Sequence, residues 1–146
     1  MALTLQEAQT VITAAHERAT QIGALVTVAI VDEGGHLQAL GRMNGAAPLS
    51  AQVAETKATS VALFRRDGAV LRQMQEATPG FFAQLDRAVR VPILAGAGAV
   101  LILRGATVLG AVAVSGGMMP GQDDECAEAG LTVLAPALRD AGHSSP

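Results

Sequence analysis

The segment VAIVDEGGHLQALGRMNGA, residues 28–46, decides the fold of this chain. It joins two strand-like runs, residues 26–32 and 37–43, through the short turn Glu33-Gly34-Gly35. Aliphatic runs separated by a glycine-containing turn are typical of a β-hairpin. The segment therefore predicts two neighbouring antiparallel strands, and the other elements can be placed around them.

Helical patterns lie on both sides of this hairpin. Before it, Thr4 and Glu7 have the spacing of a capping box, and an apolar stripe at helical spacing continues to Gly23, which can end the helix. After it, stretches rich in Ala and Val predict helices over residues 50–64 and 68–76. The hairpin thus lies between helices.

The second half of the chain returns to strands before a last helix. Thr78-Pro79-Gly80 is expected to break the helical pattern, and residues 81–90 predict no more than one helical turn. A last helix begins near Pro120 or Gly121, and Pro136 is expected to end or kink it. Three further strands are expected between these helices, at residues 91–95, 99–104 and 107–114.

The resulting order, α-β-β-α-α-β-β-β-α, favours an α+β fold with a five-stranded, mainly antiparallel sheet flanked by helices. Strands that follow one another as hairpins, without crossover helices, pair in antiparallel fashion. Within the first strand, Val28 and Ile30 face one side of the sheet and Ala29 and Val31 face the other. One domain is expected over residues 1–142, followed by a flexible tail at 143–146.

Composition excludes several classes of partner. The 146 residues carry a net charge of −3, and the three aromatic residues are all Phe, so we expect no nucleic-acid partner. The apolar run at residues 94–103 is half the length of a membrane span, and the N-terminus lacks a signal-peptide pattern. A single cysteine, Cys126, excludes an intrachain disulfide framework. We expect a cytoplasmic protein without a membrane partner.

Two charged side chains fall on apolar helix faces. Lys57 lies in the middle of the stripe formed by Val53, Ala54, Ala58, Val61 and Phe64, where it must reach water, pair with a carboxylate or line a wet pocket. Asp123 lies in the first turn of the last helix, on the same face as Cys126. Asp123 can cap that helix or belong to a site, and Lys57 can be structural, anion-binding or catalytic.

Candidate ligands for a metal or haem are few. His16 lies at the rim of the first apolar stripe, and Met118 follows the glycine loop. Imidazole and thioether groups are both haem axial ligands, although each residue can equally be an ordinary surface or lining group. No two-histidine or Cys-His spacing typical of zinc occurs, so no dedicated metal site is expected.

A second segment, AVSGGMMPGQDDECAEAG at residues 113–130, joins the hairpin in a family resemblance. Together the two segments resemble the GlcG/HbpS-like family, which includes haem-binding proteins and the C-terminal module of PduO-type proteins. The resemblance covers nearly the whole chain and implies the same antiparallel sheet flanked by helices. Arg42, Lys57 and Asp123 match positions that recur in the family. Met118 stands where relatives more often have a small polar residue, which implies a differently shaped pocket.

The resemblance leaves two functions open. The first is a small-ligand binding protein that takes haem or another tetrapyrrole, with His16 and Met118 as cofactor-binding residues. The second is a cofactor-free enzyme acting on a small organic acid in a catabolic pathway. Arg42 and Lys57 would then hold the carboxylate near Ser115, Gly116 and Gly117, and Asp123 would move a proton. A third alternative is an accessory oligomer whose inward charges form interface salt bridges.

Self-association is also expected. Only 16% of the residues are charged, and a surface rich in Ala and Gly often packs against copies of itself. The family resemblance likewise implies assemblies from dimers to larger rings. We therefore expect a homo-oligomer whose partner molecules include a small, anionic ligand.

Overall fold

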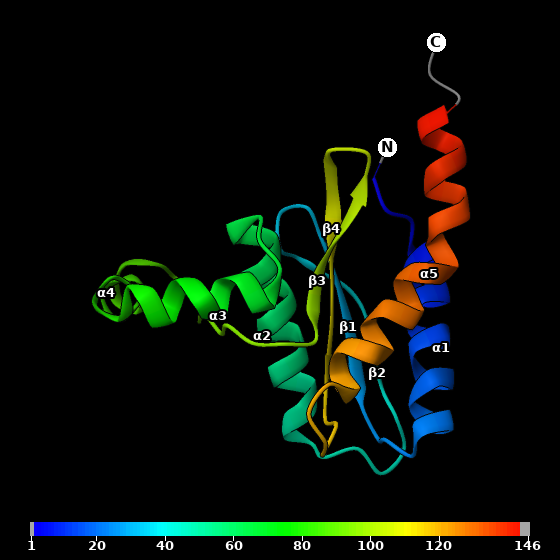
Figure 1. Ribbon diagram of the computed structural model, residues 1–146, viewed down its shortest axis with the longest axis horizontal. Coiled ribbons are helices and arrows are strands. Elements are labelled where there is room, and N and C mark those ends of the chain that lie inside the picture. Colours follow the sequence, from blue (N-terminus) through cyan, green and yellow to red (C-terminus); the bar gives the residue numbers. More distant parts are fainter. Residues whose placement is uncertain (1, 144–146) are drawn as a thin grey trace.

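The computed structural model describes the backbone of residues 2–143 and the side chains of residues 2–134. Four strands form one antiparallel sheet in the order β2-β1-β4-β3 (Figure 1). The strands are β1 (Thr27–Asp32), β2 (Leu37–Arg42), β3 (Ala99–Arg104) and β4 (Thr107–Ser115). The helices are α1 (Leu5–Ile22), α2 (Leu49–Phe64), α3 (Gly68–Ala77), α4 (Pro79–Ala88) and α5 (Gln122–His143).

Helices cover the two faces of this sheet. Helices α1 and α5 pack together on one face and α2 packs on the other, which confirms the α+β class (Figure 1). The predicted alternation in β1 is also confirmed. Val28 and Ile30 belong to the core beneath α1 and α5. Ala29 and Val31 belong to the core beneath α2.

The predicted fifth strand is wrong. Residues 91–95 form no strand and lead along the surface into β3. Pro92 has no amide hydrogen to give to a ladder, and the amide of Leu94 donates to the Ser60 hydroxyl on α2 at 2.9 Å. An aliphatic run therefore crosses from α4 to the sheet without pairing in it.

Two helix predictions also need correction. Helix α3 ends at Ala77, so the predicted break at Thr78-Pro79-Gly80 is confirmed, but Pro79 then begins α4, because the first turn of a helix needs no amide donor. Helix α4 reaches Ala88, so residues 81–90 hold far more than one turn, and its Phe82 ring stacks on Phe64 of α2 at 5.6 Å. Pro136 does not end α5, which continues to His143, although the helix changes direction along its length, as the alternative of a kink allows (Figure 1). Of the predicted tail, residues 144–146 lie outside the described residues.

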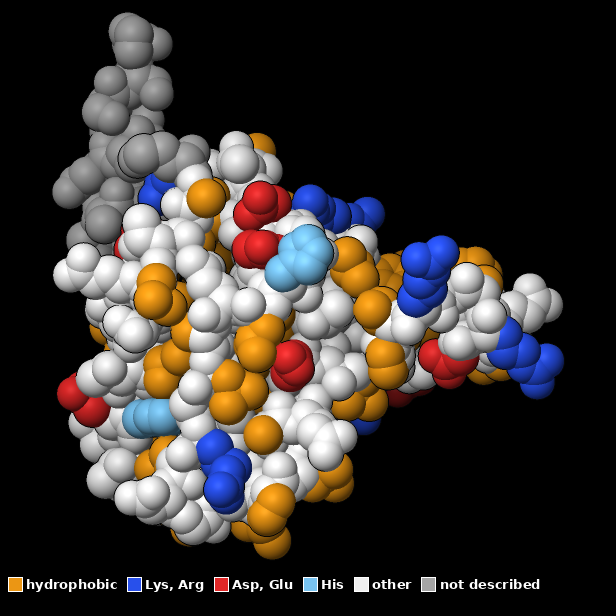
Figure 2. Space-filling model, turned by 180° about the vertical axis from the view of Figure 1, so that it is seen from behind, with side chains coloured by type: hydrophobic (Ala, Val, Ile, Leu, Met, Phe, Trp, Pro, Cys, Tyr) orange, Lys and Arg blue, Asp and Glu red, His pale blue; other side chains and the backbone are white. Residues whose placement is uncertain are grey.

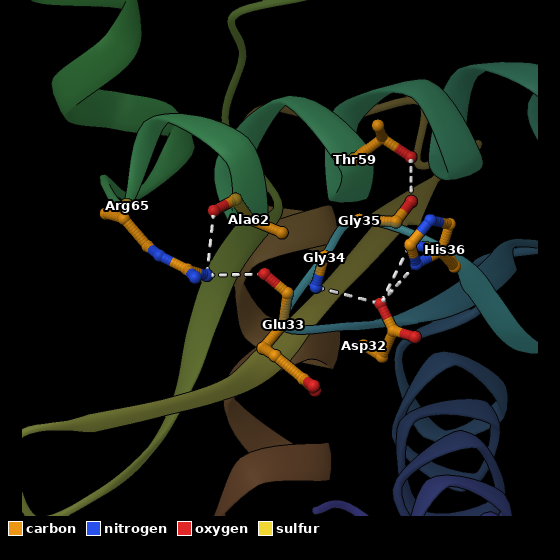
Figure 3. Close-up of polar contacts among 8 residues, drawn as sticks. All are labelled: Asp32, Glu33, Gly34, Gly35, His36, Thr59, Ala62 and Arg65. Atoms are coloured by element: carbon orange, nitrogen blue, oxygen red, sulfur yellow. Dashed lines mark hydrogen bonds and ion pairs between the residues drawn. The ribbon is translucent and has the colours of Figure 1, made fainter.

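Hydrogen bonds hold the hairpin turn in place, both within the turn and between the turn and the end of α2 (Figure 3). The Asp32 carboxylate accepts the amides of Gly34 and His36, each at 2.9 Å. Burial alone would raise the pKa of Asp32, but these amide hydrogen bonds together with the neighbouring His36 ring outweigh it and lower the pKa. From α2, Arg65 donates to the Glu33 carbonyl at 2.7 Å. The turn between β1 and β2 is thereby fixed in position.

Candidate functional site

Lys57, the sole lysine of the chain, projects from α2 into the protein interior, as helical periodicity predicts. It is 5% exposed, and its ammonium donates to the carbonyls of Ala97 at 2.8 Å and Val114 at 2.6 Å. Its head therefore joins α2 to the end of β4 and to the segment before β3. Two backbone acceptors supply much of the solvation that burial removes from the cation.

Asp123 approaches the same ammonium from the first turn of α5. Its Oδ2 atom lies 3.9 Å from Lys57 Nζ, and its Oδ1 atom accepts the amide of Gly117 at 2.9 Å. The two charges that periodicity turned inward thus form one ion pair, in which Lys57 is buried and Asp123 is half-buried. Asp123 therefore holds the glycine loop before its own helix and pairs with a cation, while its role in a site stays a prediction.

Asp124 also belongs to this cluster, although the helical wheel places it among the solvated residues. Its carboxylate accepts the amide of Gly98 at 2.6 Å. Gly98 has φ +89°, and a Cβ atom there would lie 2.6 Å from Asp123 Cβ and 2.7 Å from the Val114 carbonyl. Only glycine permits this approach. In the sequence, the sign of this contact is a glycine at position 98 just before a strand. That pattern does not identify which carboxylate binds the Gly98 amide.

Burial perturbs the pKa of both members of the pair. It lowers the pKa of the Lys57 ammonium, against the opposing attraction of the Asp123 and Asp124 carboxylates. Burial raises the pKa of Asp123, and here the Gly117 amide and Lys57 act in the opposite direction. Each group is pushed toward its neutral form, which is a frequent property of functional sites and also of structural ion pairs.

Arg42 lies on the edge strand β2, at one end of a row of cross-strand neighbours that runs across the sheet toward the Lys57–Asp123 pair. In the strand register it is opposite Thr27, which on its other side is opposite the buried Ser115 of β4. The Thr27 hydroxyl shares a 2.7 Å hydrogen bond with Ser50 of α2. The Arg42 guanidinium donates to the carbonyl of Ala46 at 2.9 Å, within the segment that joins β2 to α2. Its convergence on Lys57 and Asp123 stays a prediction.

A pocket of about 380 Å³ lies where three connecting segments meet, and we call it the loop pocket. Its walls come from residues 23–25 after α1, from Gly45 and Ala47 after β2, and from Gly116, Met118, Met119 and Gln122 before α5. Gly116 has φ +121°, and a Cβ atom there would lie 2.6 Å from the Leu25 carbonyl. The Met118 side chain lies at the mouth, where it is 91% exposed.

The other candidate residues lie apart from the loop pocket. His16 of α1 is half-buried, and its Nε2 atom lies 3.0 Å from the Gly41 carbonyl of β2. A carbonyl accepts only from a protonated nitrogen, so this bond assigns the hydrogen to Nε2 and leaves Nδ1 as the acceptor in the neutral ring. Cys126 is buried, as expected, and burial raises the pKa of its thiol to about 11. Both properties are those of a core side chain.

Two further observations concern the described part of the chain as a whole. Among its side chains, no three His, Cys, Asp or Glu residues gather in a way that could hold a metal ion. None of its helices combines the length and the apolar character that a bilayer crossing requires.

These features describe an α+β domain in which a buried Lys-Asp pair fixes a glycine-rich loop beside a small pocket. Residues 3–132 match the family described as haem degrading protein HbpS-like, and the chain belongs to that family. It is also similar to protein GlcG of Escherichia coli K12, with 42% identity over 65 residues. That match covers 44% of this chain and 48% of GlcG, so the aligned region spans about half the length of this curated relative.

Solved structures extend the similarity to nearly the whole fold. A double-mutant form of HbpS from Streptomyces reticuli superposes with a TM-score of 0.81 at 28% identity, covering 92% of this chain and 88% of HbpS. A complex of PduOC with heme superposes with a TM-score of 0.80 at 26% identity, covering 90% of this chain and 94% of PduOC. Klebsiella pneumoniae ORFY has a TM-score of 0.77 at 29% identity, covering 91% and 90%. The resemblance found in the sequence is confirmed.

Proposed function

We propose that this protein binds a small ligand in the loop pocket and that the ligand is haem or another tetrapyrrole. The observation that carries the proposal is the Met118-lined pocket in a fold shared with a PduOC–heme complex. Ligand sites in proteins are usually concave and mostly apolar, with a few polar groups that fix orientation. The loop pocket has this character.

The residues of the loop pocket suit a flat, apolar ligand with an acidic edge. Leu25, Ala47 and Met119 supply apolar wall, and Met118 supplies a thioether at the mouth. A pocket of about 380 Å³ is at the small end of the range for ligand sites, so a tetrapyrrole would stay partly exposed. Arg42 holds the carbonyl between Gly45 and Ala47, so its cation lies beside the wall that they form.

The chain can offer haem iron a soft ligand and a harder one. Haem supplies an iron centre that takes axial ligands from side chains such as Met and His. Met118 is exposed at the mouth of the pocket, whereas His16, on α1, is hydrogen-bonded to the Gly41 carbonyl of β2. His16 would have to give up that hydrogen bond to coordinate through Nε2. Met118 is therefore the proposed ligand in the loop pocket, and His16, which lies apart from that pocket, is the alternative ligand.

A haem titration followed by absorbance tests the proposal. We expect a shifted Soret band that saturates with ligand in the wild type and is weakened in Met118→Leu, which keeps the side-chain volume and removes the sulfur. Met74→Leu in α3 is the matched control and should bind like the wild type. A Soret spectrum identical to that of free haem, or one equally weakened by both substitutions, would contradict the assignment.

A second candidate is a cofactor-free enzyme acting on a small organic acid. The specific observation in its favour is the contact between Lys57 and Asp123, whose pKa values are displaced toward neutral forms. In this scheme Asp123 moves a proton, while Arg42, Lys57 and the segment Ser115-Gly116-Gly117 hold the substrate carboxylate.

A thermal-shift screen with small carboxylates separates this enzyme from the haem-binding protein. The enzyme predicts stabilisation by at least one carboxylate, because a ligand that binds only the folded state raises the melting temperature. Arg42→Gln should abolish that stabilisation, whereas Arg66→Gln, on an exposed arginine after α2, should leave it intact. If no carboxylate shifts the melting temperature while haem does, the enzyme hypothesis fails.

A further inference from the structure

The outer side of β2 is an open sheet edge. In the order β2-β1-β4-β3, β2 pairs on one side only, with β1. The amide of Met43 donates to the Val26 carbonyl at 3.1 Å, and the antiparallel alternation from that pair turns the backbone groups of residues 39 and 41 toward β1. The backbone groups of residues 40 and 42 therefore point outward. Such an edge is a template for another strand.

The strand at the opposite edge of the sheet, β3, is contacted by other parts of the chain. The amide of Leu101 donates to the Asp67 carboxylate at 2.8 Å, and α3 contacts the strand. Covering an edge with a loop or helix is one way in which proteins prevent strand pairing. The two edges are therefore not equivalent, and β2 is the one available to a partner strand.

Uncharged side chains surround the open edge of β2. Leu37 is 48% exposed and Leu40 is 37% exposed. Beside them, a hollow of about 620 Å³ separates β2 from α1, and none of its lining residues, which include Leu5, Ile12 and Ala39, carries a charge. Figure 2 shows apolar side chains scattered across this face of the molecule. A surface of this kind suits burial against another protein surface.

Charges of opposite sign flank the two ends of this edge. Arg42 is exposed at the end of β2, while Asp32 and Glu33 lie in the turn that precedes the strand. Two such edges laid side by side in opposite directions place each positive end against a negative end. The pattern is complementary to itself.

We propose that β2 is a homodimer interface, in which it pairs in antiparallel fashion with β2 of a second copy about a two-fold axis perpendicular to the sheet. The two sheets become one, and Arg42 of each copy approaches the acidic turn of the other. The same axis keeps both α1 helices on one face, so that Leu5 and Ile12 of each copy can fill the hollow above the small residues Ala39 and Gly41. The surface area buried between the two helices adds to the small area buried by the paired strands. The total then approaches the area that a stable protein interface buries.

Light scattering and sedimentation on the intact chain test this interface. The wild type should be at least a dimer, and Leu40→Lys should raise the dissociation constant at least about tenfold, because it places two cations near the two-fold axis. Leu103→Lys is the matched control, since Leu103 lies on β3 and is 42% exposed. It should leave the assembly unchanged. A monomeric wild type, or equal dissociation by both variants, overturns the proposal.

A charge exchange decides the matter if Leu40→Lys does not fold. Arg42→Glu should weaken the dimer, and adding Glu33→Arg to it should restore association, because the attractive pairs are rebuilt with reversed signs. Amide hydrogen exchange adds a local readout: the outward amides of residues 40 and 42 should be protected in the dimer and exchange freely on dissociation. Failure of Glu33→Arg to restore association, or fast exchange of both amides in the assembled wild type, overturns the proposal. Neither outcome depends on which ligand the loop pocket takes.

Discussion

Replacing Lys57 by Met removes the cation from the buried cluster while keeping an unbranched, apolar side chain of similar length. The substitution leaves the carbonyls of Ala97 and Val114 without their donors, which lie at 2.8 Å and 2.6 Å in the wild type. It also leaves the Asp123 carboxylate without the ammonium at 3.9 Å. Against these losses stands the desolvation cost of the buried ammonium, which the variant no longer carries.

The losses outweigh that relief. A hydrogen bond to a charged group contributes about 1.5–3 kcal/mol, and removing one partner of a buried ion pair costs about 3–5 kcal/mol. Because the ammonium is partly compensated by its carbonyl acceptors, we expect Lys57→Met to lower the free energy of unfolding by about 3 kcal/mol. In a chain of this size that is a fall of roughly 10 °C in melting temperature.

Urea unfolding at pH 7, followed by far-ultraviolet circular dichroism, measures this change. Arg66→Met is the control, because Arg66 is exposed after α2 and its loss should change stability by no more than about 0.5 kcal/mol. If Lys57→Met is as stable as the wild type or more stable, the carbonyl contacts of Lys57 do not stabilise the fold, and the structural part of the reasoning is refuted.

The remaining predictions concern the glycines, the carboxylate, the lysine and the thiol. Gly98→Ala should destabilise the protein by at least about 2 kcal/mol in urea, since φ is +89° and the new Cβ would overlap Asp123, whereas Gly80→Ala, with open space in α4, should be neutral or stabilising. Burial raises the pKa of Asp123 above its ordinary value of 3.8, so the folded state favours the protonated carboxyl group. The stability that this protonation contributes is fully present below pH 3.8 and is lost as the pH rises through the folded-state pKa. The stability of the wild type relative to Asp123→Asn should therefore fall as pH rises, and a pH-independent difference would contradict this. Lys57, as the sole lysine, should give one side-chain ammonium signal in NMR that titrates below 10.5, and an ordinary value would show that it is solvated. The Cys126 thiol, with its pKa raised to about 11, should resist a thiol reagent at pH 8 in the folded protein and react in urea, and rapid native reaction would disprove its burial.

Sequence patterns predicted the parts of the fold that local chemistry determines. The capping box at Thr4 and Glu7 forms as expected, with both of its hydrogen bonds in place. The hairpin at residues 28–46 and the inward direction of Lys57 follow from strand alternation and helical periodicity, which depend only on neighbouring residues. The family resemblance was equally visible in the two quoted segments.

The errors arose where tertiary contacts outweigh local pattern. Residues 91–95 are aliphatic enough for a strand, but Pro92 and the bond from Leu94 to Ser60 hold them outside the sheet. The break before Pro79 is confirmed, but a proline in the first helical turn also starts a helix, and the sequence pattern did not predict that α4 reaches Ala88. Helical periodicity places Asp124 on the solvated side of α5, and its actual partner, the amide of Gly98, lies 26 residues away in sequence. No local rule identifies such a partner.

The central claim, that the loop pocket is the ligand site, is tested most directly by methionine-methyl NMR during haem addition. The chain has five methionines, of which Met118 and Met119 line the loop pocket while Met74 lies in α3. The account predicts that the paramagnetic iron broadens the signals of Met118 and Met119 at stoichiometric haem and leaves Met74 unchanged. Unchanged signals from both pocket methionines, or broadening at Met74 instead, would contradict it.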